Sequence, residues 1–135
     1  MQFRDLNAQY NRLKEEIDEG IKSVIQSSSY ILGAQVKEFE TKLQDYVGVK
    51  HCITCANGTD ALILPLMAWD IGKGDAVFVP DFTFFATVNC VMGRGATPIL
   101  VDIEEDTFNI SPVALENAIQ DVITQGNLKP KIIIP

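Results

Sequence analysis

Continuously apolar, strand-like segments alternate with helix-like segments in the second half of this chain. Three of these segments are Asp75–Val79, Thr97–Asp102 and Lys131–Ile134, and their apolar residues follow one another instead of alternating with polar ones. A strand that is apolar on both sides must be covered on both faces, which is typical of a parallel sheet between helices. The chain is therefore predicted to be an α/β protein with a mostly parallel sheet and helices on both faces.

The alternation also predicts a further strand and three helices around these segments. His51–Cys55 is expected to be a strand because it is rich in β-branched and thiol side chains. Helices are expected at Thr59–Trp69, at Thr83–Met92 and after Ser111, where Ser is a good N-cap and the following Pro suits the first helical position.

The first 48 residues carry two amphipathic helices and no strand. Apolar residues recur every three or four positions over residues 6–28 and again from Ala34 to Tyr46, and Gly48 is placed to end the second helix. The chain is therefore divided into an N-terminal helical segment, residues 1–48, and an α/β domain, residues 49–135. Because the chain closes on the strand-like run Lys131–Ile134, we expect this domain to be incomplete and the chain to be part of a longer protein.

The charge balance excludes several classes of partner. The chain has 11 Lys and Arg against 18 Asp and Glu, which gives a formal net charge of −7. Nucleic acids and anionic lipid surfaces both select a basic face, so neither partner is expected. No apolar run approaches the roughly 20 residues that span a bilayer, and the polar first residues do not resemble a secretion signal. A cytoplasmic protein with reduced cysteines is therefore expected.

The strongest candidate site is a turn between a strand and a helix, Ala56-Asn57-Gly58-Thr59-Asp60-Ala61-Leu62. Parallel sheets bind ligands at the carboxyl ends of their strands, and the first turn of a helix offers unpaired N–H groups to an anion. Gly58 would let a phosphate approach the backbone, and Thr59 adds a hydroxyl. The Asp60 carboxylate would repel a phosphate, so we assign its backbone N–H to the anion and expect its side chain to turn elsewhere.

The alternative for this turn is an ordinary helix cap, which the residues alone favour over a phosphate site. A dinucleotide fingerprint and a P-loop are both absent from the sequence. A second candidate is the set of phenylalanines at positions 82, 84 and 85, since one ring near the end of a strand could stack on a flat cofactor. The residues alone favour the alternative that all three rings belong to the core.

No metal site is expected. Cys52 and Cys55 would point to opposite faces of a strand, and His51 is the only histidine, so a tetrahedral zinc site lacks ligands. Buried thiols are the better interpretation of this cysteine pair. The acidic run Asp102–Asp106 lacks the ligand spacing of a calcium loop and is expected to be a solvated loop.

Together, five motifs in this order resemble the sugar aminotransferases of the DegT/DnrJ/EryC1/StrS family over essentially the whole chain. The motifs are Phe3-Arg4-Asp5-Leu6, Tyr30-Ile31-Leu32-Gly33 followed by Val36 and Phe39-Glu40, Ala56 to Leu62, Pro80-Asp81-Phe82-Thr83-Phe84, and Gly95-Ala96-Thr97-Pro98 leading to Val101-Asp102. The segments Tyr30–Gly33 and Cys55–Leu62 are most similar to the bacterial branch that aminates a UDP-linked 3-oxo-glucuronic acid.

The resemblance implies the N-terminal part of the large domain of a type I aminotransferase, with pyridoxal phosphate as cofactor and an active site shared across a homodimer. It implies that the backbone and hydroxyl of Thr59 and the backbone of Asp60 hold the cofactor phosphate, and that Phe84 stacks on the pyridine ring. The residues that it places near the sugar nucleotide are Gly58, Ser28, Ser29, Tyr30 and Ile31. It thereby changes the expectation for the turn from a cap to a phosphate site, and for Phe84 from core to stacking ring.

The implied reaction is transfer of an amino group, with glutamate as the expected donor, to a keto-sugar nucleotide in cell-surface polysaccharide or related sugar biosynthesis. In this family the Schiff-base lysine, the Asp that pairs with the pyridine nitrogen and a phosphate-binding Ser come later than Pro135. No catalytic residue is therefore expected in this segment, and the 135 residues alone are expected to be inactive.

Three alternatives remain open at this point. One is a sugar dehydratase that uses pyridoxal phosphate on the same scaffold. Another is a non-catalytic, truncated fragment that binds a partner through its first two helices. The third is a flavodoxin-like binding domain, which explains two leading helices poorly.

Overall fold

The computed structural model describes residues 3–135, which divide after Thr54 into two compact units. The first unit contains α1 (Leu6–Ser27) and α2 (Ala34–Val47), so both helices predicted from periodicity are confirmed. The Asp5 side chain accepts a hydrogen bond from the Ala8 N–H at 2.9 Å and caps the start of α1. Gly48 ends α2 in a left-handed conformation, with φ of 74°, which glycine adopts without steric penalty.

The connector between α1 and α2 is tightly turned. Ser28 closes α1 in a left-handed conformation with φ of 54°, and its N–H donates to the Ile25 carbonyl oxygen at 3.2 Å. Leu32 also has a positive φ, of 49°. At Gly33 the backbone approaches the Ser29 carbonyl so closely that a Cβ would lie 2.5 Å from that oxygen. The connector therefore depends on the missing side chain at Gly33.

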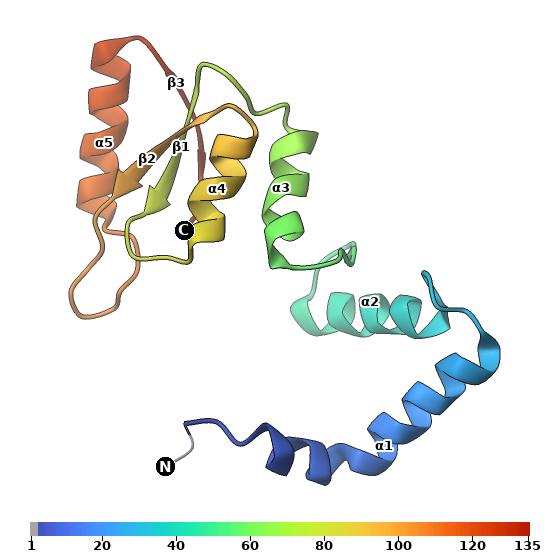
Figure 1. The fold of residues 1–135 in the computed structure, drawn as a ribbon. Helices are drawn as coiled ribbons and strands as arrows, with labels where there is room; N and C mark the ends of the chain where they lie inside the picture. The colour runs from blue at the N-terminus through green and yellow to red at the C-terminus, as the bar shows by residue number, and fades with distance from the viewer. Residues whose placement is uncertain (1–2) are drawn as a thin grey trace. The chain divides into compact units, whose positions relative to one another are not determined.

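The second unit is a three-stranded parallel sheet with helices on both faces, which confirms the predicted α/β class. Its elements, in chain order, are α3 (Gly58–Ala68), β1 (Asp75–Pro80), α4 (Phe85–Gly93), β2 (Thr97–Val101), α5 (Pro112–Gln125) and β3 (Lys129–Ile133). The strand order is β2-β1-β3, so β1 lies in the centre (Figure 1). The Ser111 hydroxyl accepts from the Ala114 N–H at the start of α5, as the sequence predicts.

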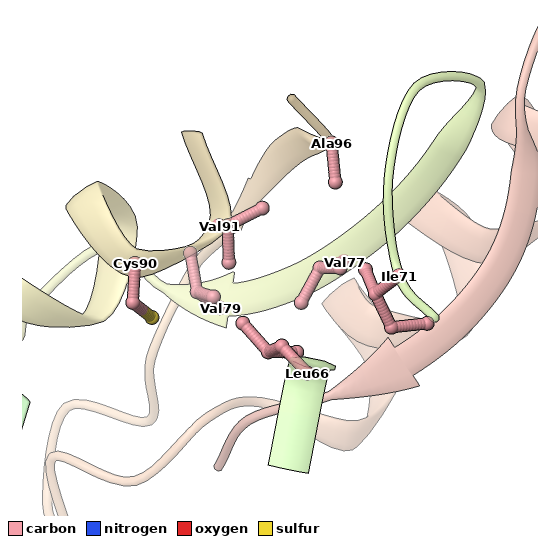
Figure 2. Close-up of a cluster of buried hydrophobic side chains, with 7 residues drawn as sticks. All are labelled: Leu66, Ile71, Val77, Val79, Cys90, Val91 and Ala96. Carbon is pink, nitrogen blue, oxygen red and sulfur yellow. The ribbon is translucent and has the colours of Figure 1, made fainter. Parts of the chain in front are cut away.

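The central strand β1 separates two layers of core. Val77 and Val79 pack with α3 and α4 on one face, where Leu66, Cys90 and Val91 meet them (Figure 2). The residues between them along the strand, Ala76 and Phe78, pack against α5 on the other face, around Val122. Alternate side chains of a strand point to opposite faces, so the unbroken apolar run from Ala76 to Val79 is what two covered faces require.

The sheet topology gathers several chain segments at one edge of the sheet. In a parallel sheet the carboxyl ends of the strands lie together, and each helix that follows or precedes a strand must run back in the opposite direction. Figure 1 shows that α3, α4 and α5 all begin at the edge where β1 and β2 end. The turn before α3 and the loop Asp81–Phe84 before α4 therefore lie at the carboxyl edge of the sheet.

The strand predicted at His51–Cys55 is wrong. These residues form neither a helix nor a strand, and Ile53 is 83% exposed. No strand among residues 3–135 pairs with this segment, and the Thr54 N–H donates to the Glu40 carboxylate instead of a neighbouring strand. The segment has β propensity but lacks a partner, and propensity alone does not make a strand.

The interpretation of Cys52 and Cys55 as buried thiols is also corrected. Cys55 is exposed and Cys52 is only half-buried, whereas Cys90, on α4, is buried. The segment that carries the pair forms no strand, so the pair is not enclosed in the way that a strand between two layers of helices would be. In the part of the chain that the structure describes, no helix is long and apolar enough to cross a membrane.

Replacing Gly33 by alanine is expected to destabilise the first unit by about 1–3 kcal/mol, because the new Cβ collides with a backbone oxygen that cannot move aside. Gly20→Ala is the matched control, since a Cβ at Gly20 meets no atom within 4 Å. Alanine inside a helix should stabilise α1 by about 0.5–1 kcal/mol relative to glycine. Urea unfolding followed by circular dichroism measures both changes, and a Gly33→Ala variant as stable as the wild type would contradict the close approach.

Candidate functional site

The turn before α3 is shaped by Asn57. Its backbone is extended, with φ of −164° and ψ of 173°, and the helix begins at the next residue, Gly58. The Asn57 Oδ1 accepts a hydrogen bond from the Asp60 N–H at 2.9 Å, and the Asn57 carbonyl oxygen accepts from the Ala61 N–H at 3.1 Å. Asn57 is thus the N-cap of α3, a role that its short polar side chain suits well.

Asn57 also binds the side chain of Asp60. The Asn57 Nδ2 donates to the Asp60 Oδ2 at 3.1 Å, so the Asn57 side chain binds both the backbone N–H and the carboxylate of Asp60. The carboxylate turns toward the cap, in the manner expected of a side chain that must avoid an anion. The Asp60 N–H, which the sequence assigned to the phosphate, is engaged by Asn57 in this structure.

The backbone N–H groups of Gly58 and Thr59 at this turn are free. Within residues 3–135, neither the N–H of Gly58 nor that of Thr59 has a hydrogen-bond partner, and the Thr59 hydroxyl has none either. A Cβ at Gly58 would meet nothing within 4 Å, so the space beside this glycine is open. Unpaired N–H groups at a helix start carry a partial positive charge and favour an anion. This end of α3 can therefore accept a phosphate through two amides and one hydroxyl.

The phenylalanines before α4 lie on the surface. Phe82, Phe84 and Phe85 are 66%, 79% and 70% exposed, so the alternative that all three belong to the core is wrong. Phe84 is the N-cap residue of α4, and its carbonyl oxygen accepts from the Thr87 N–H at 3.0 Å. Phe82 instead packs against Phe108, with ring centroids 5.6 Å apart. The Phe84 ring is thus open to a ligand. Phe84 directly precedes α4, which begins at the same edge of the sheet as α3 (Figure 1).

The other predicted substrate residues lie in the connector of the first unit. Tyr30 lines an apolar groove of about 490 Å³, whereas Ser28, Ser29 and Ile31 do not line it. The residues around this groove, besides Tyr30, are Glu16, Ile17, Gly20, Ile21, Val24, Ile25 and Gln35. Glu16, Gln35 and the Tyr30 hydroxyl bring its polar side-chain groups and the other side chains are apolar, so the groove by itself does not suit a sugar nucleotide. The placement of the connector near the sugar nucleotide stays a prediction.

Sequence reasoning missed two residues that shape these segments. The sequence predicts a turn at Asn57, although a polar residue followed three positions later by an acid is the spacing of an N-cap and its N3 partner. Glu40 belongs to a family motif, which predicts no contact for its carboxylate. Its Oε1 accepts from both the N–H and the hydroxyl of Thr54, each at 2.8 Å. No local pattern connects two residues that are fourteen positions apart.

The titratable groups of the described chain show few perturbations that bear on a site. The Thr54 backbone N–H, followed by its hydroxyl, lowers the pKa of the Glu40 carboxyl below its usual range. Burial raises the pKa of the Cys90 thiol, so this cysteine is not an activated nucleophile. No group of three or more His, Cys, Asp or Glu side chains within residues 3–135 comes together as a metal site.

Comparison with known proteins gives a consistent result. A model of the DegT/DnrJ/EryC1/StrS aminotransferase family matches residues 11–135. The UDP-2-acetamido-2-deoxy-3-oxo-D-glucuronate aminotransferase of Pseudomonas aeruginosa is 49% identical over 119 residues, which are 88% of this chain and 33% of that protein. The chain spans about a third of the length of the curated relatives that it matches.

Solved structures match the fold as well as the sequence. A crystal structure of a DegT DnrJ EryC1 StrS aminotransferase from Brucella abortus superposes with a TM-score of 0.98 at 51% identity, over 100% of this chain and 36% of that chain. The GDP-4-keto-6-deoxy-D-mannose-3-dehydratase of E. coli, solved with bound hydrated PLP, superposes with a TM-score of 0.71 at 28% identity, over 76% of this chain and 28% of that chain.

Acid is expected to weaken the link between Glu40 and Thr54. Because the pKa of Glu40 is lowered in the folded chain, its stabilising effect is complete above its unfolded pKa, about 4.3, and is lost as pH falls through the folded value. The amide proton resonance of Thr54, followed by NMR, should therefore titrate with a midpoint below about 4.3. The titration should vanish in Glu40→Gln and persist in the control Glu15→Gln. A Thr54 resonance that titrates equally in Glu40→Gln would contradict the contact.

Proposed function

Because the chain belongs to the DegT/DnrJ/EryC1/StrS aminotransferase family, we propose that the complete protein transfers an amino group to a keto-sugar nucleotide. Enzymes of this family use pyridoxal phosphate, and we propose the same cofactor here. The similarity to the UDP-2-acetamido-2-deoxy-3-oxo-D-glucuronate aminotransferase supports a UDP-linked 3-oxo-glucuronic acid as the acceptor. Glutamate is the proposed amino donor.

The observation that carries this proposal is the free pair of amides at the start of α3. The N–H groups of Gly58 and Thr59 and the Thr59 hydroxyl form an open set of three donors at the positive end of a helix. These residues fit the phosphate of pyridoxal phosphate. When bound, the cofactor supplies an electron sink for breaking and forming bonds to nitrogen. This chain's part is to hold the phosphate and thereby fix where the reacting atoms lie.

Phe84 completes the proposed cofactor site. It is the N-cap residue of α4, which begins beside α3 at the same edge of the sheet (Figure 1), and its side chain is exposed. An aromatic ring stacked on a flat cofactor excludes water from one face of the cofactor and limits the rotation of the cofactor.

The Asp60 N–H can contact the phosphate only if Asn57 releases it, so Gly58 and Thr59 are the principal backbone donors in this proposal.

The remaining assignments concern the sugar and the assembly. We propose that Gly58 lies near the sugar nucleotide, together with the connector residues Ser28, Ser29, Tyr30 and Ile31. We assign residues 1–48 to an N-terminal helical segment and residues 49–135 to part of the cofactor-binding large domain. We assign no catalytic residue to this chain, and we propose a homodimer. A cytoplasmic location and a role in polysaccharide biosynthesis stay predictions.

A second candidate reaction is removal of water from a sugar nucleotide. It is favoured by the match to the E. coli GDP-4-keto-6-deoxy-D-mannose-3-dehydratase, whose fold covers 76% of this chain. Both reactions place the same demand on the residues described above, namely a bound phosphate and a stacked ring. A non-catalytic fragment that binds a partner through α1 and α2 is a third candidate, and it predicts no bound cofactor.

The amino-transfer proposal is tested with the complete protein, pyridoxal phosphate, a UDP-linked 3-oxo-glucuronic acid and glutamate labelled with nitrogen-15. We expect the label to replace the keto oxygen of the sugar nucleotide, with one 2-oxoglutarate formed from each glutamate. Water released at the sugar carbon is balanced by the water that supplies the keto oxygen of 2-oxoglutarate, so no net water forms. Mass spectrometry of the sugar nucleotide measures the transfer. Loss of water without uptake of the label identifies a dehydratase, and an unchanged sugar with no bound cofactor supports a non-catalytic protein.

Thr59→Val is expected to weaken binding of pyridoxal phosphate to the cofactor-free complete protein by about tenfold, because a hydrogen bond to a charged group is lost. Fluorescence titration with the cofactor measures the dissociation constant. Thr124→Val is the matched control, since the Thr124 hydroxyl donates to the Gln120 carbonyl oxygen on the exposed side of α5. A dissociation constant in Thr59→Val equal to that of the wild type would remove Thr59 from the site.

A further inference from the structure

The Asn57 side chain makes two hydrogen bonds to Asp60, and capping requires only one of them. Asn57 Oδ1 accepts from the Asp60 N–H at 2.9 Å, which caps the helix. Asn57 Nδ2 in addition donates to Asp60 Oδ2 at 3.1 Å. Ser, Thr and Asp also provide the acceptor that an N-cap needs, but ionised Asp has no donor, and Ser and Thr have a single oxygen for both contacts. An amide side chain accepts and donates through two separate atoms.

The other capped helices of the chain show what capping requires by itself. Asp5 caps α1 by accepting from Ala8, and Ser111 caps α5 by accepting from Ala114. In both helices the residue three positions after the cap is alanine, so no side chain has to be held. Among the helices of residues 3–135, only α3 has an acid at this position and an amide side chain as its cap.

We propose that Asn57 is a positioning residue of the phosphate site: it holds the Asp60 carboxylate against the cap and leaves the amides of Gly58 and Thr59 to the anion. This inference rests on the proposed function. Asp60 is the next residue after Thr59, so a freely rotating carboxylate would place a negative charge beside the phosphate. The repulsion between like charges rises as their distance falls, and the Asn57 Nδ2 limits how closely the carboxylate can approach.

Charge also explains why the acid is compatible with the turn. A carboxylate in the first turn of a helix is favoured by the partial charge of the helix start, so Asp60 supports α3 in the absence of a ligand. The same acid would compete with a phosphate for that partial charge. Asn57 resolves the competition because its side chain gives the carboxylate a neutral donor of its own, outside the Gly58 and Thr59 amides.

The test separates two interactions of the Asn57 side chain: the one that accepts from the Asp60 N–H and the one that donates to the Asp60 carboxylate. Asn57→Ser keeps an acceptor for the Asp60 N–H but lacks the separate Nδ2 atom that donates to the Asp60 carboxylate. In the cofactor-free complete protein we expect Asn57→Ser to keep the wild-type Tm and to bind pyridoxal phosphate about tenfold more weakly. Asp60→Asn, which removes the charge, should bind the cofactor more tightly than the wild type. Adding Asp60→Asn to Asn57→Ser should restore most of the lost affinity.

A purely structural role of Asn57 predicts a different pattern. If Asn57→Ser weakens binding by the same factor with Asp60 and with Asp60→Asn, the two residues are not coupled and the inference is overturned. Ser111→Ala is the matched control: it removes the cap of α5, lowers Tm and should leave the affinity for pyridoxal phosphate unchanged.

The binding measurements distinguish failure of the proposed function from failure of the role of Asn57. A wild-type complete protein that does not bind pyridoxal phosphate contradicts the proposed function and this inference together. A wild type that binds the cofactor, with an Asn57→Ser variant that binds it equally well, contradicts only the role of Asn57.

Discussion

The burial of β1 on both faces is the constraint on which the rest of the second unit depends. Val77 and Val79 require a layer formed by α3 and α4, while Ala76 and Phe78 require α5 on the opposite face. Three helices that pack antiparallel to the strands must all begin at the carboxyl edge of the sheet. The free amides of α3 and the exposed ring of Phe84 share that edge because the core demands it, and the proposed site is a consequence of this packing.

The turn before α3 must satisfy two requirements that oppose each other. A helix start is stabilised when its N–H groups are capped, whereas a phosphate site needs those same groups uncapped. The structure divides the donors: Asp60 gives its N–H to Asn57, and Gly58 and Thr59 keep theirs. Cap and anion site, which were alternatives at the level of sequence, therefore coexist in one turn.

Most elements could be predicted from the sequence because local interactions decide them. The periodicity of α1 and α2, the Ser111 cap and the apolar run of β1 all lie within a few residues and were confirmed. The strand predicted at His51–Cys55 failed because a strand needs a partner elsewhere in the chain. The exposure of Phe84 could not be predicted for the same kind of reason: whether an aromatic side chain is covered depends on which distant segments pack over it.

The sequence by itself determined the helices, the two-faced character of the sheet and the family, since each is written in residue spacing or in motifs of a few residues. Only the tertiary structure decided which amides of the turn are free, that Glu40 binds Thr54, and that three phenylalanines face solvent. The physical reason is the distance along the chain over which each kind of interaction acts. Periodicity and capping act between residues less than two helical turns apart, whereas burial and side-chain pairing depend on segments that meet only after the chain has folded.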